Sequence, residues 1–134
     1  MECRDVIVLD THAWIWYVAD PDRLSEPARL AIAGASSIAV SPISCWEIAT
    51  KAARGKLILD RDVDVWIRQA LACDRVELTP ISASIATQAG LLGNSGFHGD
   101  PADRILAATA MAAGTCLVTK DAQIQAFEPV QTVW

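Results

Sequence analysis

The sequence predicts an α/β protein, a three-layer α/β/α sandwich around a mostly parallel central sheet of four to five strands. Short apolar, β-branched runs alternate along the chain with longer segments that have helical spacing, as in strand–helix–strand units. The runs are apolar throughout, which is typical of strands covered on both faces of a sheet. At 134 residues, 52% of them hydrophobic, the chain is long enough for one core. We therefore expect a single domain over residues 1–134.

In the first half of the chain, local signals set the expected element ends. Asp-Pro-Asp at 20–22 breaks the first helical segment, and residues 25–27 start the second, which ends near Gly34. Ser41-Pro42 marks the exit of the second strand, and Gly55 suits the position just past a helix. The expected elements are a strand at 6–9, a turn or short helix at 11–18, a helix at 25–34, a strand at 37–40 and helices at 44–53 and 62–72.

In the second half, the clearest local signal is Asp100-Pro101. Asp is a favoured N-cap and Pro is accepted at the first helical position, so a helix is expected to start there and to run to about residue 113, before Gly114. The other expected elements are a strand at 75–78, a helix at 82–91, a loop at 94–99, a strand at 116–119, a short helix at 121–126 and an edge strand at 130–133.

Composition limits the cellular setting. No apolar stretch approaches the roughly 20 residues that cross a bilayer, and the start of the chain has the pattern of a strand rather than a signal peptide. We expect a soluble, cytoplasmic protein without a membrane partner. The net charge of −5 does not exclude a nucleic-acid partner, because cations bound in an acidic pocket reverse the local charge. The four cysteines lack CxxC spacing and are expected to be reduced packing residues: Cys3, Cys45, Cys73 and Cys116.

Acidic residues recur where an α/β sheet would bring them together. Each lies at or just past the carboxyl end of an apolar run, or in the first turns of the helix that follows one: Asp10, Glu47, Asp103 and Asp121. Four carboxylates in one pocket repel each other strongly unless divalent cations neutralise them. Oxygen-only ligands favour Mg²⁺ or Mn²⁺. The pattern predicts a magnesium or manganese site.

Structural interpretations compete with this one at Asp10, Glu47 and Asp121. Asp10 and Asp121 are each placed to be the N-cap of a following helix. Glu47 can pair with Lys51 one helical turn away. For each acid taken alone the structural and the functional interpretation are evenly balanced. That separate structural roles should coincide at one end of a sheet is the weaker account.

Two acids compete for one ligand position in the segment DPAD. Asp100 is well explained as an N-cap, and it can also pair with Arg104 four residues on. Asp103 lies one turn into the helix and is expected to point toward the sheet end. We therefore place Asp103 first as a ligand and Asp100 second.

Four segments together resemble the PIN-domain family, and more closely the VapC-type toxins of VapBC toxin–antitoxin pairs. They are DTHAWIW (10–16), SPISCWEIATKAARGKL (41–57), HGDPADRILAATAMA (98–112) and LVTKD (117–121). The resemblance covers nearly the whole chain, with the motifs in family order and spacing. It implies a Mg²⁺- or Mn²⁺-dependent endoribonuclease, usually a homodimer, inhibited by a small cognate antitoxin. In the family's pattern, Asp10, Glu47, Asp103 and Asp121 match the acidic quartet, with Asp100 as an accessory acid.

Other polar and aromatic residues are candidates for substrate or protein contacts. Thr11 and Thr119 adjoin the acids and can orient a carboxylate, a bound water or the substrate. The helix end near Glu47 carries a basic cluster that can bind RNA phosphates or simply complement the helix dipole: Lys51, Arg54 and Lys56. His12 and His98 are either substrate contacts or solvated residues. Tryptophans can stack on unpaired bases or pack in cores and interfaces, and Trp14 and Trp16 are candidates for dimer or antitoxin contact.

Three other functions fit the sequence less well than a nuclease. A catalytically inactive PIN-like RNA- or protein-binding module is the alternative, and the intact acidic quartet argues against it. A receiver or phosphatase domain would have a second acid close after Asp10, and the sequence Asp10-Thr11-His12 lacks it. A doubly wound nucleotide binder is excluded by the absence of GxGxxG and GxxxxGK[ST] motifs.

Overall fold

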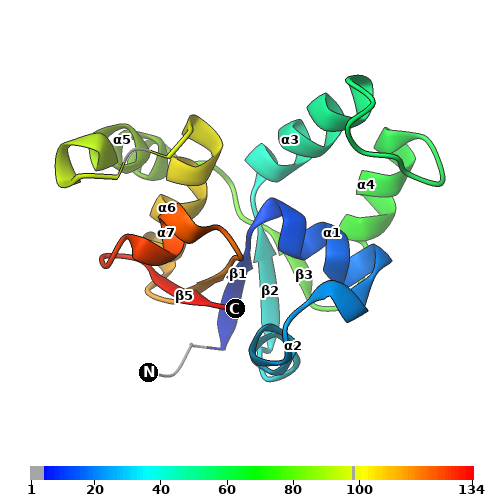
Figure 1. Cartoon of the computed structure of the whole chain (residues 1–134), viewed down its shortest axis with the longest axis horizontal. Coiled ribbons are helices and arrows are strands. Elements are labelled where there is room, and N and C mark those ends of the chain that lie inside the picture. Colours follow the sequence, from blue (N-terminus) through cyan, green and yellow to red (C-terminus); the bar gives the residue numbers. More distant parts are fainter. Residues whose placement is uncertain (1–4, 98) are drawn as a thin grey trace.

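A five-stranded, fully parallel sheet forms the centre of the fold (Figure 1). The computed structural model describes residues 5–97 and 99–134. In the sheet the strands follow the order β3-β2-β1-β4-β5. Their bounds are β1 (Val6–Leu9), β2 (Ser37–Val40), β3 (Val76–Leu78), β4 (Cys116–Val118) and β5 (Gln131–Val133). The expected parallel α/β sheet is confirmed, including the strand at the C-terminal edge.

Helices cover both faces of the sheet. Their bounds are α1 (Thr11–Ala19), α2 (Glu26–Ala33), α3 (Pro42–Ala53), α4 (Val63–Leu71), α5 (Ala83–Leu91), α6 (Pro101–Ala113) and α7 (Ala122–Ala126), with 3₁₀ turns η1 (Pro21–Arg23) and η2 (Leu92–Ser95). Helices α1 to α4 pack on one face, and α5, α6 and α7 pack on the other. Alternate residues of β1 enter the two cores, since Ile7 and Leu9 face α1 to α4 while Val8 faces α5 to α7. The three-layer architecture follows.

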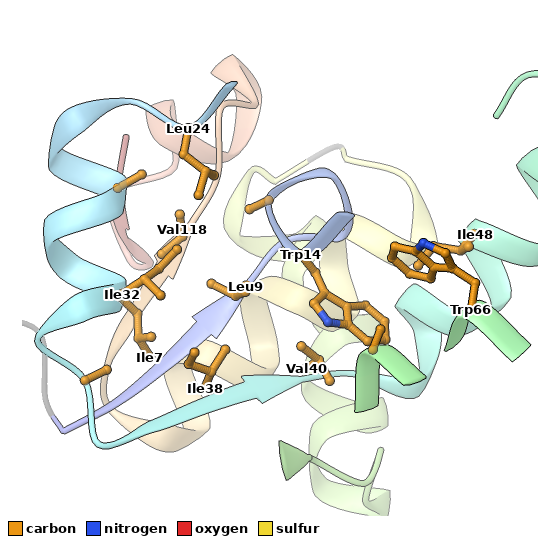
Figure 2. Packing of buried hydrophobic residues seen from close by; sticks show 14 residues of the cluster. Ile7, Leu9, Trp14, Leu24, Ile32, Ile38, Val40, Ile48, Trp66 and Val118 are labelled. Atoms are coloured by element: carbon orange, nitrogen blue, oxygen red, sulfur yellow. The ribbon is translucent and has the colours of Figure 1, made fainter. Parts of the chain in front are cut away.

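Trp14 lies at the centre of the larger core (Figure 2). Its side chain is fully buried, and its ring meets the Trp66 ring of α4 edge-on, with 6.1 Å between ring centroids. Leu9 and Val40 lie on the strands beneath it in the same cluster. Trp14 is therefore a core residue that fixes α1 and α4 over the sheet, and its expected role in a protein–protein contact is wrong.

The largest difference in element bounds concerns α3. It begins at Pro42, two residues before the expected start at 44, because the Ser41 side chain is the N-cap and accepts a hydrogen bond of 3.2 Å from the Ile43 backbone N–H. Ser41-Pro42 is thus the beginning of the helix as well as the exit of β2. The expected loop at 94–99 begins inside the turn η2. The bounds of the other helices and strands agree with expectation or differ by one residue.

The cysteines only partly match expectation. Cys45 and Cys73 are free thiols, as expected, whereas Cys116 is disulfide-bonded, so the expectation of a reduced thiol is wrong there. Sequence spacing does not reveal which thiols a fold brings together. Cys3 lies outside the described residues. Within residues 5–97 and 99–134, no helix has the length and apolar character needed to span a membrane.

Candidate metal centre at the sheet edge

The topology brings the acidic segments to one edge of the sheet. All five strands are parallel, so their carboxyl ends lie together. In the sheet, β2 and β3 follow β1 on one side. The chain then crosses over, and β4 and β5 lie on the other side of β1. The point where the order reverses lies between β1 and β4. Asp10 directly follows β1, and Thr119 directly follows β4.

Asp10 is held from two sides at this point. Its Oδ1 accepts a hydrogen bond of 2.7 Å from the Thr11 backbone N–H, and its Oδ2 accepts one of 2.5 Å from the Thr119 hydroxyl. The Thr119 oxygen in turn accepts a hydrogen bond of 3.0 Å from the Asp121 backbone N–H. The Asp10 carboxylate is nearly buried, with 4% of the residue exposed. The buried Thr119 side chain therefore connects the acids that follow β1 and β4.

Glu47 reaches the same region from α3. Its Oε1 accepts a hydrogen bond of 2.5 Å from the Thr11 hydroxyl, which also lies 2.8 Å from the Ser44 hydroxyl. Because the Thr11 proton is directed at Glu47, Ser44 is the donor in that second contact. Sequence reasoning missed Ser44, although its place three residues before Glu47 puts both side chains on one helix face.

Asp100 and Asp103 take different roles at the start of α6. Asp100 is the N-cap, and its Oδ1 accepts a hydrogen bond of 2.9 Å from the Asp103 backbone N–H. Its side chain is exposed, whereas Asp103 is half-buried. Within the described residues, no donor reaches the Asp103 carboxylate. Asp103 is thus the acid at this edge that is least satisfied by the protein itself.

Electrostatics set Asp103 apart. Burial, together with the charges of Asp100, Asp10, Asp121 and Glu47, raises the pKa of its carboxyl to about 7. The other four acids singled out in the sequence therefore all lie within electrostatic reach of Asp103. Burial likewise raises the pKa of Glu47, while the Thr11 hydrogen bond and Lys51 oppose that rise. Without a cation, the pocket resists full ionisation.

The donor set suits a hard divalent cation. The five acids offer oxygen ligands, which favour Mg²⁺ or Mn²⁺ over zinc. In the part of the chain that the structure describes, no three His, Cys, Asp or Glu side chains converge closely enough to form a ready-made coordination cage. Mg²⁺ commonly keeps several waters and takes only one or two carboxylates, so an open acidic pocket fits it. The unsatisfied Asp103 carboxylate is the group best placed to gain from a cation.

The structural alternatives for the acids have mixed outcomes. Asp10, Asp100 and Asp121 are all N-caps, so capping and a shared pocket coexist. The Glu47–Lys51 ion pair is absent among the described residues, although Lys51 is near enough to act on the Glu47 pKa. The expected pair of Asp100 with Arg104 is also absent there, because the Arg104 Nε–H donates to the Gly99 carbonyl at 2.9 Å.

The remaining candidates lie at different depths. Thr11 and Thr119 are buried, and their hydroxyls are occupied by carboxylates. The basic side chains of Lys51, Arg54 and Lys56 are exposed around the end of α3. Of these three, Lys51 is the one whose charge acts on the pKa of Glu47 and of His12, lowering both. His98 lies outside the described residues.

His12 borders the acids on the side of β5. Its Nδ1 lies 3.5 Å from Asp10 Oδ2, and its Nε2 accepts a hydrogen bond of 3.0 Å from the Lys120 backbone N–H. Burial lowers the pKa of His12, with the Asp10 charge opposing the shift. An acceptor Nε2 and a lowered pKa together describe a neutral imidazole whose proton is on Nδ1, facing Asp10.

Comparison with known proteins agrees with this architecture. The sequence profile of the PIN domain matches residues 7–128, nearly the whole chain. The chain therefore belongs to the PIN-domain family. Within that family it is 40% identical over 131 residues to Ribonuclease VapC22 of Mycobacterium tuberculosis, with 96% of this chain and 98% of that protein covered.

Solved structures with the same fold come from toxin–antitoxin complexes. DNA-bound VapBC from Salmonella typhimurium superposes with a TM-score of 0.70 at 19% identity, covering 98% of this chain and 97% of that one. VapBC-1 from nontypeable Haemophilus influenzae gives 0.68 at 19%, covering 95% and 96%. A toxin-antitoxin complex from Klebsiella pneumoniae gives 0.64 at 21%, covering 92% and 94%. At these identities, the likeness concerns the fold.

Proposed function

We propose that the chain is a Mg²⁺- or Mn²⁺-dependent endoribonuclease and the toxin of a toxin–antitoxin pair. The observation that carries this proposal is the Asp103 carboxyl, half-buried and without a donor among the described residues, in the field of four other carboxylates. A pocket of this kind is unfavourable for the protein alone and is relieved by a divalent cation. The 40% identity to Ribonuclease VapC22 supports RNA as the substrate.

Asp10, Asp103 and Asp121 would hold the cation, with Glu47 close by and Asp100 as an accessory acid. A bound Mg²⁺ lowers the pKa of a coordinated water and stabilises negative charge on a phosphate. The protein's own contribution is orientation. Thr119 fixes the Asp10 carboxylate, and Thr11 fixes that of Glu47, so the acids are set before substrate arrives.

The reaction would be hydrolysis of a phosphodiester by water in line with the leaving oxygen, giving 5′-phosphate and 3′-hydroxyl ends. No Ser, Cys or His nucleophile is required for it. Among the three basic residues around the end of α3, Lys51 acts electrostatically on Glu47 and would bind a substrate phosphate. Arg54 and Lys56 would extend the contact along the RNA backbone. Thr11 and Thr119 would act on substrate through the carboxylates that they hold.

The proposed partners follow from the relatives. The solved neighbours named above include VapBC and toxin-antitoxin complexes, which supports a small antitoxin that binds this chain. The same proposal includes a homodimer of this chain, which forms a heteromeric complex with the antitoxin, and a cytoplasmic location.

The test is cleavage of total cellular RNA by the purified, antitoxin-free chain with Mg²⁺, Mn²⁺ or EDTA. Asp103→Asn is the test variant, and Asp64→Asn is the matched control, because Asp64 is an exposed acid at the start of α4, away from the sheet edge. We expect cutting that requires metal, survives in the control and is lost in Asp103→Asn. If folded, metal-supplied wild type cuts no RNA, the nuclease proposal fails and the non-catalytic binding module takes its place.

A further inference from the structure

Three aromatic rings form a cluster beside the acids. His12 and Trp16 come from α1, one helical turn apart, and Trp134 follows β5. The ring centroids are 5.1 Å apart for His12 and Trp16, 5.9 Å for His12 and Trp134, and 5.7 Å for Trp16 and Trp134. Because β5 is parallel to β1, its end brings Trp134 to the sheet edge where Asp10 lies.

Two cations lie against this aromatic cluster. The Arg23 guanidinium carbon is 4.6 Å from the Trp16 ring centroid, and the Lys120 Nζ is 5.9 Å from it. Both residues are exposed. Neither forms an ion pair with a carboxylate among the described residues. In a chain with a net charge of −5, this spot offers two cations whose charge is not neutralised by a neighbour.

The cluster is continuous with the candidate metal centre. His12 joins the two, since its Nδ1 faces Asp10 while its ring contacts Trp16 and Trp134. Lys120 is adjacent to Asp121 in the chain, and its backbone N–H holds the His12 ring in place through Nε2. A nucleotide next to a phosphate bound at the acids would therefore reach these rings.

We propose that His12, Trp16, Trp134, Arg23 and Lys120 form a binding subsite for one unpaired nucleotide beside the scissile phosphate. The base stacks on the partly exposed Trp134 ring, Lys120 binds the adjoining phosphate, and Arg23 adds positive charge to the subsite. Single-stranded nucleic acids are bound by this combination of aromatic faces and cations. This inference rests on the proposed nuclease function and adds a preference for unpaired RNA.

A binding experiment separates base stacking from phosphate contact. The probes are a short fluorescent single-stranded RNA of mixed sequence and an oligomer of equal length that keeps the backbone but lacks the bases. Affinities of the full chain are measured with Ca²⁺ in place of Mg²⁺, and gels confirm that the probes stay intact. Trp134→Ala is the stacking variant because Trp134 lies outside the regular elements, just after β5, and is only half-buried. Lys120→Ala and Arg23→Ala are the charge variants.

Matched controls come from residues of the same type outside the cluster. Trp46→Ala removes an exposed tryptophan on α3 that is 61% accessible, and Arg68→Ala removes an exposed arginine on α4. Thermal melting of every variant checks that the fold is retained. A variant of the cluster that melts far below wild type is replaced by the milder Trp134→Leu, which keeps apolar bulk but has no ring face.

The expected result for Trp134→Ala is a loss of about fivefold or more in affinity for the RNA and no loss for the base-free oligomer. Lys120→Ala lowers the affinity for both probes. It also reduces the salt dependence of that affinity by roughly the contribution of one phosphate contact. The two controls bind as wild type does. RNA affinity that is unchanged in Trp134→Ala and Lys120→Ala would overturn the subsite and assign the cluster to protein contact.

The same variants distinguish this inference from the nuclease proposal. If wild type cleaves RNA in a metal-dependent way and the cluster variants bind RNA as wild type does, the subsite proposal fails and the nuclease proposal stands. If the chain cleaves no RNA but its RNA affinity depends on Trp134 and Lys120, the subsite proposal stands and the nuclease proposal fails.

Discussion

The Thr119 hydroxyl donates a 2.5 Å hydrogen bond to Asp10 Oδ2, and its oxygen accepts one from the Asp121 backbone N–H. One buried side chain thus joins the acid after β1 to the acid after β4, across the point where the strand order reverses. Since the hydroxyl proton is committed to Asp10, the carboxylate has a fixed orientation before any cation or substrate is bound.

Thr119→Val tests this connection. Valine keeps the shape of the side chain but removes the hydroxyl, so Asp10 loses one of its two donors and Asp121 loses its N–H acceptor. We expect RNA cleavage to fall by about 10- to 100-fold and the Mg²⁺ concentration for half-maximal rate to rise. Thr109→Val is the control, because the buried Thr109 hydroxyl donates to the Ile105 carbonyl within α6 and has no other partner in the part of the chain that the structure describes. Equal rates for the two variants would show that Thr119 does not position the acid.

Asp103 gives a prediction for stability against pH. Its carboxyl ionises at 3.8 in the reference state and at about 7 in the folded, metal-free protein. Between these values the folded state keeps a proton that the unfolded state has released, so the stability linked to Asp103 is complete below the lower value and is lost as the pH rises to about 7. We expect the melting temperature in EDTA to fall more steeply over this range in wild type than in Asp103→Asn.

Added Mg²⁺ should reverse that loss. Metal ligands bind as ionised carboxylates, so Mg²⁺ should raise the melting temperature of wild type strongly above the Asp103 pKa of about 7 and little near the reference value of 3.8. Asp103→Asn should respond weakly at either pH. Parallel melting curves for wild type and variant, with and without Mg²⁺, would mean that Asp103 is not a ligand.

The fold was predictable because its signals are local. A few neighbouring residues are enough to recognise a buried strand, an N-cap such as Asp100, or a break at Pro or Gly. The closeness of the acids to one another could be predicted for a related reason. The carboxyl ends of parallel strands all lie at one edge of the sheet, so residues that follow them are brought together. Long-range partners leave no such local signal: the contact of Thr11 with Ser44, the burial of Trp14 and the approach of Trp134 to His12 depend on how the elements pack.

Glu47→Gln separates catalysis from stability at α3. The raised pKa of Glu47 means that its ionised form is disfavoured in the metal-free protein, so a neutral amide relieves that cost and still accepts the Thr11 hydrogen bond. We expect cleavage to fall about tenfold or more, with a metal-free melting temperature equal to or above that of wild type at pH 8. Glu77→Gln, at an exposed position on β3, should leave both unchanged. A clear drop in melting temperature for Glu47→Gln alone would indicate a structural role.

Gly99 lies close to Phe97 and Asp103, with no room for a side chain. A Cβ on Gly99 would lie 2.5 Å from the Phe97 ring and 3.1 Å from the Asp103 Cβ. Phe97 is buried and stacked on Phe127, so its ring has little room to yield. Gly99→Ala should cost roughly 1–3 kcal/mol of unfolding free energy and reduce cleavage through Asp103. Urea denaturation measures the first quantity and initial cleavage rates the second.

Gly90→Ala is the matched control for that substitution. Gly90 is exposed within α5, and a Cβ there would meet nothing within 4 Å. Alanine has the higher helix propensity, so this variant should gain about 0.4–1 kcal/mol and cleave RNA at the wild-type rate. Similar losses at both glycines would contradict a specific role for the approach of Gly99 to Asp103.

A crystal of the chain soaked in Mn²⁺ tests the metal centre most directly, because the anomalous signal locates the ion independently of any activity. The account predicts a peak within ligand distance of Asp10 and Asp103, at the carboxyl ends of β1 and β4, and no such peak in Asp103→Asn crystals. A peak elsewhere, or none at the acids in crystals that contain Mn²⁺ at other sites, would contradict the assignment of these carboxylates as the metal centre.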